Sequence, residues 1–330
     1  MNRAAPVLAL VVMLASGPVV ATELKLAHFM SPQHPMDRGI MGPLAQQVAE
    51  ETKGALKIKV YPAGELGAGP NQQYRRAVTG VADIAFNLPQ YTPAQFRRTV
   101  LLHVPGLFAG PEEATRSIWK NIGTLADDFS EVKLLAFWTN NPSVLFTRST
   151  PVRSLADMRG LKIRIPDPVS AELVKAWGGI PVSLPATETY NAMSTGVVDG
   201  VMIDPSAVGS YKLHEVTKFV TMNTPGALST FTLIMNRNAW NGLSADHKAL
   251  LERLTGASLS VKAAKVFKGA GDKGIETLRS AAVERIMLEP AQVEQFRAAM
   301  KEPVAQFLKS EGQKGGFDGQ ALVKKFAVEN

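Results

Sequence analysis

Residues 246–285 read DHKALLERLTGASLSVKAAKVFKGAGDKGIETLRSAAVER and decide the architecture of the chain. Apolar or small residues recur here at every third or fourth position: Leu250, Leu254, Ala257, Val261, Ala264, Phe267, Gly271, Ile275, Leu278 and Ala282. This spacing predicts one uninterrupted helix of ~60 Å, about twice the width of a domain, because the stretch contains no proline. A helix of that length indicates a bridge across two lobes. Gly269, Gly271 and Gly274 indicate close packing or a break within it, or else a flexible point between the lobes.

The order of strands and helices supports two lobes, because a strand–helix alternation occurs twice. The first series predicts strands at 24–29, 56–61, 82–87 and 132–139 and helices at 36–52, 71–79 and 112–129. The second predicts strands at 144–148, 161–165, 180–184 and 197–203 and helices at 170–177 and 188–195. A strand near 285–288 and helices at 291–308 and 319–327 close the chain. Such alternation is typical of sheets flanked by helices, which is the α/β class.

Composition excludes several classes of protein. The 330 residues, 45% hydrophobic and 20% charged, are enough for two globular lobes. The net charge of +7 is spread along the chain without a basic block, so we expect no nucleic-acid partner. The absence of cysteine excludes disulfides, thiolate metal sites, cysteine nucleophiles and a lipoprotein anchor.

The N-terminus predicts export. Arg3 precedes the apolar run VLALVVMLA at 7–15. The segment Val19-Val20-Ala21 then offers a small residue at a cleavage point. This pattern is typical of a signal peptide, which we place at 1–21 with cleavage after Ala21. The alternative, a membrane anchor, needs ~20 apolar residues, but Ser16, Gly17 and Pro18 interrupt the run. We therefore expect an exported protein.

Catalytic and metal motifs are missing from the sequence. It contains no HExxH, no GxSxG and no GxGxxG after a strand, and no two histidines stand four residues apart. We therefore expect no enzyme activity, no cofactor and no metal ligands. One alternative stays open: Glu188 and Asp199 are the only candidate acid–base pair for an exported α/β enzyme acting on an organic acid.

The stretch GLKIRIP at 160–166 holds the strongest binding candidate. If Leu161, Ile163 and Ile165 face the core, Arg164 lies on the other face, near the end of the strand that Pro166 terminates. Ligands of α/β lobes bind at the carboxyl ends of strands, and a guanidinium fits a carboxylate with two parallel hydrogen bonds. Arg164 is therefore either a surface side chain or a carboxylate anchor.

Four motifs with the same order and spacing carry a family resemblance. GLKIRIP at 160–166, GGIPV at 178–182, ETYNAM at 188–193 and GVVDG at 196–200 resemble the DctP-type periplasmic solute-binding proteins of TRAP transporters. The resemblance implies a two-lobed periplasmic binding protein (type II-like) with mixed sheets flanked by helices, the lobes joined by hinge strands and one long bridging helix. It also implies that Arg164 grips a substrate carboxylate.

The resemblance further implies partners and a location. The partners are a small organic carboxylate and the small and large membrane subunits of an ion-gradient-driven TRAP permease, and the location is the periplasm. A receptor for an ABC importer or a sensor is the alternative within the same class. Lobe I is expected to comprise 22–143 plus about 230–268, and lobe II 144–229 plus about 269–330.

Three departures from the family pattern indicate the ligand. Val144 stands where many members have a second arginine, Ile203 where they have asparagine, and Ala186 where they often have phenylalanine. The ligand is therefore expected to be a monocarboxylate with an apolar or aromatic body, such as a 2-oxo, 2-hydroxy or aromatic acid, because a second buried carboxylate would lack partners. The expected substrate-binding residues are Arg164, His28, Phe86, Asn87, Trp138, Val144, Phe146, Asp167, Tyr190, Ile203 and Asp204.

Overall fold

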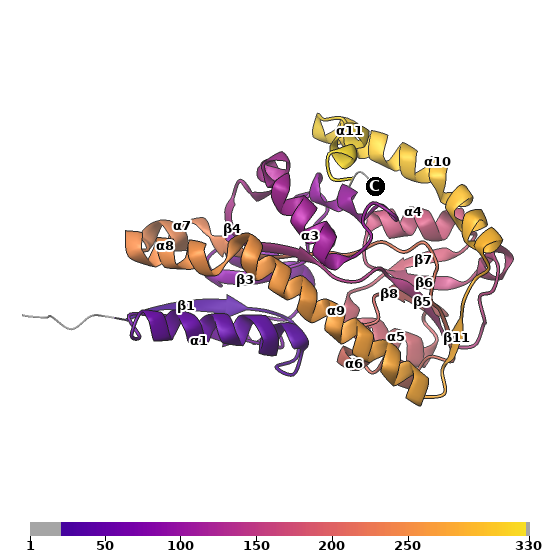
Figure 1. Ribbon diagram of the computed structural model, residues 1–330, viewed down its shortest axis with the longest axis horizontal. Coiled ribbons are helices and arrows are strands. Elements are labelled where there is room, and N and C mark those ends of the chain that lie inside the picture. Colours follow the sequence, from indigo (N-terminus) through magenta and orange to yellow (C-terminus); the bar gives the residue numbers. More distant parts are fainter. Residues whose placement is uncertain (1–20, 328–330) are drawn as a thin grey trace, which may run out of the picture.

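The computed structural model describes residues 21–327 and shows two lobes, each a mixed sheet flanked by helices (Figure 1). The sheet of lobe I has the strand order β2-β1-β3-β10-β4. Its strands are β1 (Thr22–Ala27), β2 (Leu56–Tyr61), β3 (Ile84–Asn87), β4 (Val132–Thr139) and β10 (Thr230–Asn236). Its helices are α1 (Gly42–Glu51), α2 (Gln73–Val78), α3 (Pro111–Lys120), α7 (Arg237–Gly242) and α8 (Ala245–Leu254).

Lobe II is built on a six-stranded sheet of order β11-β9-β5-β8-β6-β7. Its strands are β5 (Val144–Thr147), β6 (Lys162–Ile165), β7 (Ile180–Ser183), β8 (Gly200–Ile203), β9 (Phe219–Thr221) and β11 (Glu284–Ile286). Its helices are α4 (Pro168–Ala176), α5 (Thr189–Thr195) and α6 (Ala207–Ser210), with α10 (Pro290–Gly315) packed on α4 and α11 (Gly319–Lys324) packed on α10. The predicted fold class, two α/β lobes with mixed sheets, is confirmed.

The chain passes between the sheets at three places. Strand pairing changes sheet between Thr139 and Val144 and again between Thr221 and Thr230. We call residues 140–143 the first crossing segment and residues 222–229 the second crossing segment. The third connection is helix α9 (Gly256–Ser280), which packs on β4 of lobe I and on α6 of lobe II. Figure 1 shows α9 running diagonally from α8 to the neighbourhood of α5 and α6. The exact residue boundaries of the two lobes stay a prediction.

The bridging helix is shorter than the 40-residue stretch predicts. Helices α8 and α9 are separated at Thr255, and Gly256 has a φ of +67°, a conformation that favours glycine. The 25 residues of α9 extend ~37 Å. The break therefore lies upstream of the glycine cluster, and the helix is continuous through Gly269, Gly271 and Gly274.

Two of these glycines permit close packing. A Cβ atom on Gly274 would lie 2.0 Å from the carbonyl oxygen of Pro205, just before α6. A Cβ atom on Gly271 would lie 2.3 Å from Nδ2 of Asn141, in the first crossing segment. The close-packing interpretation therefore holds for both residues, because the helix touches lobe II and the crossing segment without room for a side chain.

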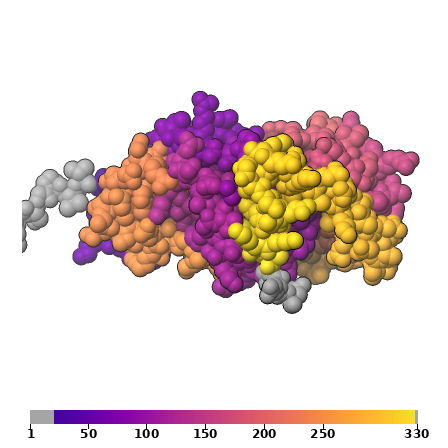
Figure 2. All heavy atoms as spheres, turned by 90° about the horizontal axis from the view of Figure 1, so that it is seen from above, coloured from indigo at the N-terminus to yellow at the C-terminus, as the bar shows by residue number. Residues whose placement is uncertain are grey.

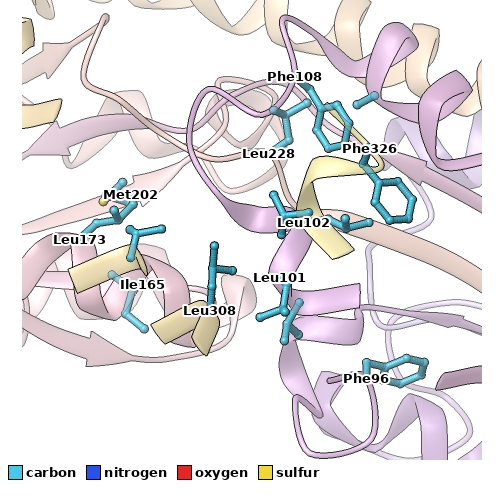
Figure 3. Close-up of a cluster of buried hydrophobic side chains, with 14 of the residues drawn as sticks. Phe96, Leu101, Leu102, Phe108, Ile165, Leu173, Met202, Leu228, Leu308 and Phe326 are labelled. Atoms are coloured by element: carbon cyan, nitrogen blue, oxygen red, sulfur yellow. The ribbon is translucent and has the colours of Figure 1, made fainter. Parts of the chain in front are cut away.

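One apolar cluster continues from lobe I into lobe II. Figure 3 shows Leu101 and Leu102, on a short 3₁₀ helix at Thr99–His103, close to Ile165 and Leu173 of lobe II and to Leu308 and Phe326 of the C-terminal segment. In the space-filling view the C-terminal helices, in yellow, cover the middle of the molecule (Figure 2). The two lobes thus share a packed apolar contact beside the crossing segments.

The predicted signal peptide falls on residues 1–20, which lie outside the described residues. From residue 21 to residue 327, no helix combines the length and the hydropathy that a membrane span requires.

Candidate ligand-binding site

Arg164 is buried at the carboxyl end of β6, with an exposed fraction of only 1%. Strand β6 lies between β7 and β8, pairs with both in parallel, and ends before Pro166. The Nε atom of Arg164 donates to the carbonyl oxygen of Leu184 at 2.8 Å, and Nη2 lies 3.4 Å from the hydroxyl oxygen of Tyr91. Nη1 is buried and has no hydrogen-bond partner among residues 21–327. Because a buried cationic donor without a partner is costly, the geometry calls for an anion beside Arg164.

A pocket opens beside this guanidinium and contains about 520 Å³ of unfilled space, including its mouth to solvent. The pocket is lined by Phe29, Met30, His34, Leu88, Gln90, Tyr91, Asn140, Arg164, Pro166, Ala186, Ile203, Asp204, Ser206, Ala207, Ser210, Tyr211, Ser229, Phe231 and Phe267. These residues come from both lobes, from both crossing segments and from α9. A mostly apolar pocket between two lobes with a few convergent polar groups is typical of a site for a small molecule.

Aromatic rings form one wall of the pocket. The ring centroids of Phe231, on β10, and Phe267, on α9, are 4.7 Å apart. Phe29 follows β1, and its centroid lies 6.4 Å from that of Tyr91. Since such a wall offers apolar surface and ring faces but few polar atoms, it suits a flat apolar ligand body.

A hydrogen-bond network joins both crossing segments at the pocket floor. Asn140 donates through Nδ2 to Asp204 at 2.7 Å and accepts the Ser229 backbone N–H through Oδ1 at 2.7 Å. Asp204 also accepts the backbone N–H of Ser206 at 2.9 Å. Burial raises the pKa of Asp204, although the hydrogen bonds from Ser206 and Asn140 oppose that shift. The network fixes the end of β8 against the points where the chain changes lobe.

Tyr91 connects the lobes at the pocket edge. It lies on a 3₁₀ turn, Pro89–Tyr91, directly after β3 of lobe I. Its hydroxyl oxygen accepts the backbone N–H of Ala186 in lobe II at 2.8 Å, in addition to its contact with Arg164. Tyr91 therefore positions the guanidinium and holds the lobes together on that side.

Two titratable side chains of the wall, His34 and Tyr211, are neutral near pH 7. Burial lowers the pKa of His34 to about 3, and its Nδ1 accepts the backbone N–H of Met36 at 3.2 Å. The proton of the neutral ring is therefore on Nε2. Burial also raises the pKa of Tyr211. Arg164 is thus the cationic side chain of the pocket lining, next to uncharged donors.

Comparison with known proteins shows the family of the chain. Residues 26–311 match the family model of DctP, the bacterial extracellular solute-binding proteins of family 7. The chain belongs to the DctP family. The resemblance of the four sequence motifs is therefore confirmed.

Relatives of this DctP-family chain include proteins with different ligands. The C4-dicarboxylate-binding periplasmic protein DctP of Rhodobacter capsulatus is 28% identical over 83% of this chain and 81% of its own length. A TRAP solute-binding protein of Rhodoferax ferrireducens, solved with copurified benzoate, has a TM-score of 0.88 and 27% identity, covering 93% of this chain and 97% of that one. A third, from Bordetella bronchiseptica with bound mandelate, has a TM-score of 0.84 and 26% identity, covering 93% and 98%.

Three of the residues predicted from the sequence line the pocket of this DctP-family chain: Arg164, Ile203 and Asp204. Ile203 is the cross-strand partner of Val144 in the antiparallel pair of β5 and β8. Both side chains are buried, with Val144 just behind the pocket lining. The two apolar departures from the family pattern therefore lie side by side near the pocket.

Three other predicted residues are displaced by one position from residues that line the pocket. His28, Asn87 and Asp167 lie outside the lining, whereas their neighbours Phe29, Leu88 and Pro166 belong to it. Successive side chains of an extended chain point to opposite faces, so one step along the sequence changes the environment. These three residues are therefore adjacent to the pocket lining without belonging to it, and their contact with a ligand stays a prediction.

Each of the three has a structural partner instead. The Nε2 atom of His28 lies 2.7 Å from a carboxylate oxygen of Asp37, and burial lowers the pKa of His28. Asn87 donates to the hydroxyl of Thr232 at 3.3 Å. Asp167 begins α4 by accepting the backbone N–H of Ser170 at 2.8 Å.

Aromatic residues predicted for the pocket lie mostly in the cores. Phe86 and Trp138 are fully buried in lobe I with ring centroids 5.8 Å apart, and Phe146 is fully buried in lobe II. Phe231 stacks on Phe86 at 5.6 Å and is the ring of this group that reaches the pocket. Tyr190, on α5, lies outside the lining and donates to Glu215 at 2.9 Å. These four side chains contact other residues of the chain and lie outside the pocket lining, so their contact with a ligand stays a prediction.

One sequence rule selects two pocket residues, Gln90 and Tyr91, that are absent from the predicted site. Gln90 and Tyr91 follow β3 directly, and ligands of α/β lobes bind at the carboxyl ends of strands. Applied to the loop after the strand rather than to its last residues, this rule selects both. Phe231 and Phe267 had no such signal, because the pairing of β10 with β3 and β4 places Phe231 there and the packing of α9 on β4 places Phe267 there.

The candidate acid–base pair is not part of the site. Asp199 accepts the backbone N–H of Lys162 at 2.9 Å, and Glu188 is exposed just before α5. Neither side chain lines the pocket. In the described range, 21–327, no group of three or more histidine or acidic side chains is arranged to hold a metal ion.

Proposed function

We propose that this DctP-family protein captures an aromatic or similarly apolar monocarboxylate between its lobes. The observation that carries the proposal is the buried Nη1 of Arg164, which has no partner in residues 21–327 and faces a pocket with an aromatic wall. A carboxylate there would complete the hydrogen bonding of the guanidinium, and a ring would gain ~25 cal/mol per Å² of apolar surface buried. The solved relatives with benzoate and mandelate support this class of ligand.

The same pocket disfavours a second carboxylate. Val144 and Ile203 are buried as a cross-strand pair, and neither offers a donor. A second ionised carboxylate placed against these two side chains would lack partners there, which costs several kcal/mol. One relative is named for C4-dicarboxylates. In the present chain the apolar pair of Val144 and Ile203 favours a ligand with a single carboxylate instead.

The cellular role follows from the family and the N-terminal sequence. The protein is exported by a cleaved signal peptide, binds its ligand in the periplasm and releases it unchanged to the small and large membrane subunits of a TRAP permease. The family match supports this role over a receptor for an ABC importer or a sensor. The placement of Glu188 and Asp199 away from the pocket supports binding without catalysis.

A thermal-shift panel tests the proposed ligand class. At concentrations about 100-fold above the dissociation constant, benzoate, benzoylformate or phenylacetate is expected to raise the melting temperature by about 3–8 °C. Succinate and sialic acid at the same concentrations are expected to shift it by less than about 1 °C. Stronger stabilisation by succinate or sialic acid than by the aromatic acids would contradict the proposed class.

A further inference from the structure

Gln90 is a buried polar side chain of the pocket wall whose hydrogen-bonding groups are both unused. Its exposed fraction is 3%, and neither Nε2 nor Oε1 has a partner in the described part of the chain. It lies on the turn after β3, next to Tyr91, whose hydroxyl is 3.4 Å from Nη2 of Arg164. Gln90 and Arg164 thus line one small pocket.

The chemistry of a carboxamide restricts what satisfies it. Its NH₂ group donates and its oxygen accepts, and leaving both buried and unpaired is costly. An unsubstituted ring offers neither role, and a carboxylate can accept from the NH₂ group but leaves the carboxamide oxygen without a donor. A neutral hydroxyl both donates and accepts, and therefore pairs with either end of the side chain.

We propose that Gln90 recognises a hydroxyl group on the body of the ligand, so that the cognate ligand is a hydroxylated aromatic monocarboxylate. This inference rests on the proposed function of the pocket, with Arg164 binding the carboxylate. The ligand then has two polar anchors in the pocket, Arg164 and Gln90, and the rings of Phe231 and Phe267 belong to the same lining. Gln90 is in this account a specificity-determining residue.

Isothermal titration calorimetry of wild-type protein with phenylacetate, its 2-, 3- and 4-hydroxy derivatives and mandelate provides the test. At least one hydroxylated acid is expected to bind about tenfold or more tightly than phenylacetate, because a site built to bond a hydroxyl discriminates against its absence. In Gln90→Met, which keeps the chain length without the polar atoms, that advantage is expected to fall below about threefold.

The matched control is Gln95→Met, five residues downstream and outside the pocket lining, which should retain the hydroxyl advantage. Phenylacetate binding without any hydroxyl advantage in wild type, or an advantage that persists in Gln90→Met, overturns the inference and leaves the proposed function standing. Absence of binding by every acid of the panel overturns both. Where Gln90→Met does not fold, the absence of a hydroxyl advantage in the wild-type protein still overturns the inference.

Discussion

Arg164→Ala is expected to weaken the binding of an aromatic acid such as benzoate by about two to three orders of magnitude, measured by calorimetry. The guanidinium is buried at 1% exposure, and its free Nη1 is the donor that the ligand would complete. Removing one partner of a desolvated, charge-assisted pair leaves the carboxylate buried without compensation. Affinity near the wild-type value in Arg164→Ala would contradict the assignment.

Arg164→Lys serves as the charge-conserving control. Lysine keeps the positive charge but replaces a planar fork by a point donor, so most of the loss is expected to remain. It would also lose the geometry that reaches the carbonyl oxygen of Leu184 and the hydroxyl of Tyr91 together. Melting curves of both variants without ligand establish that the fold is retained.

The second large effect is expected from a charge placed on the pocket wall. Ala186 is half-buried, lines the pocket and donates its backbone N–H to the Tyr91 hydroxyl that also contacts Arg164. The Ala186→Asp variant is expected to bind benzoate about 100- to 300-fold more weakly than Ala186→Asn. The new carboxylate repels the ligand by about 3 kcal/mol at ~5 Å and an effective dielectric of about 20, and it competes for Arg164.

Ala186→Asn is the matched control because it has the same shape without the charge. Raising the salt concentration should narrow the difference between the two variants, since part of the repulsion is screened at a half-exposed position. Equal affinities of Ala186→Asp and Ala186→Asn, measured by calorimetry at low salt, would place the bound carboxylate elsewhere.

The two lobes and the position of Arg164 were predictable because both depend on local patterns. Strand and helix periodicity together with Pro166 locate the end of β6, where ligands of α/β lobes bind. The family motifs then assigned the arginine. The pairing of Val144 with Ile203 shows why two departures far apart in the sequence have one joint consequence.

The rest of the site depends on long-range pairing that local patterns do not encode. Strand β10 enters the sheet of lobe I antiparallel between β3 and β4, and together with the packing of α9 on β4 this brings Phe231 beside Phe267. All seven residues of β10 are buried, so it lacks the alternation that marks a half-exposed strand. The break at Thr255 was also missed, because the apolar stripe continues across it.

Three residues of the predicted site stand one position away in sequence from residues that line the pocket. His28, Asn87 and Asp167 are adjacent in sequence to lining residues. Their side chains make hydrogen bonds with other residues outside the pocket lining. Whether a side chain faces a cleft or a core depends on the twist and end of each strand, which change within one residue. The predicted site therefore lies at the sheet edge where the pocket is, although only three of its eleven residues, Arg164, Ile203 and Asp204, line that pocket.

Mass spectrometry of the small molecule released from freshly purified protein tests the central claim most directly. We expect the wild-type protein to release an aromatic or similarly apolar acid with one carboxylate. The Arg164→Ala variant, prepared in parallel, is expected to carry none of it. Release of a C4-dicarboxylate or a sugar acid from the wild-type protein, retained in equal amount by Arg164→Ala, would contradict it.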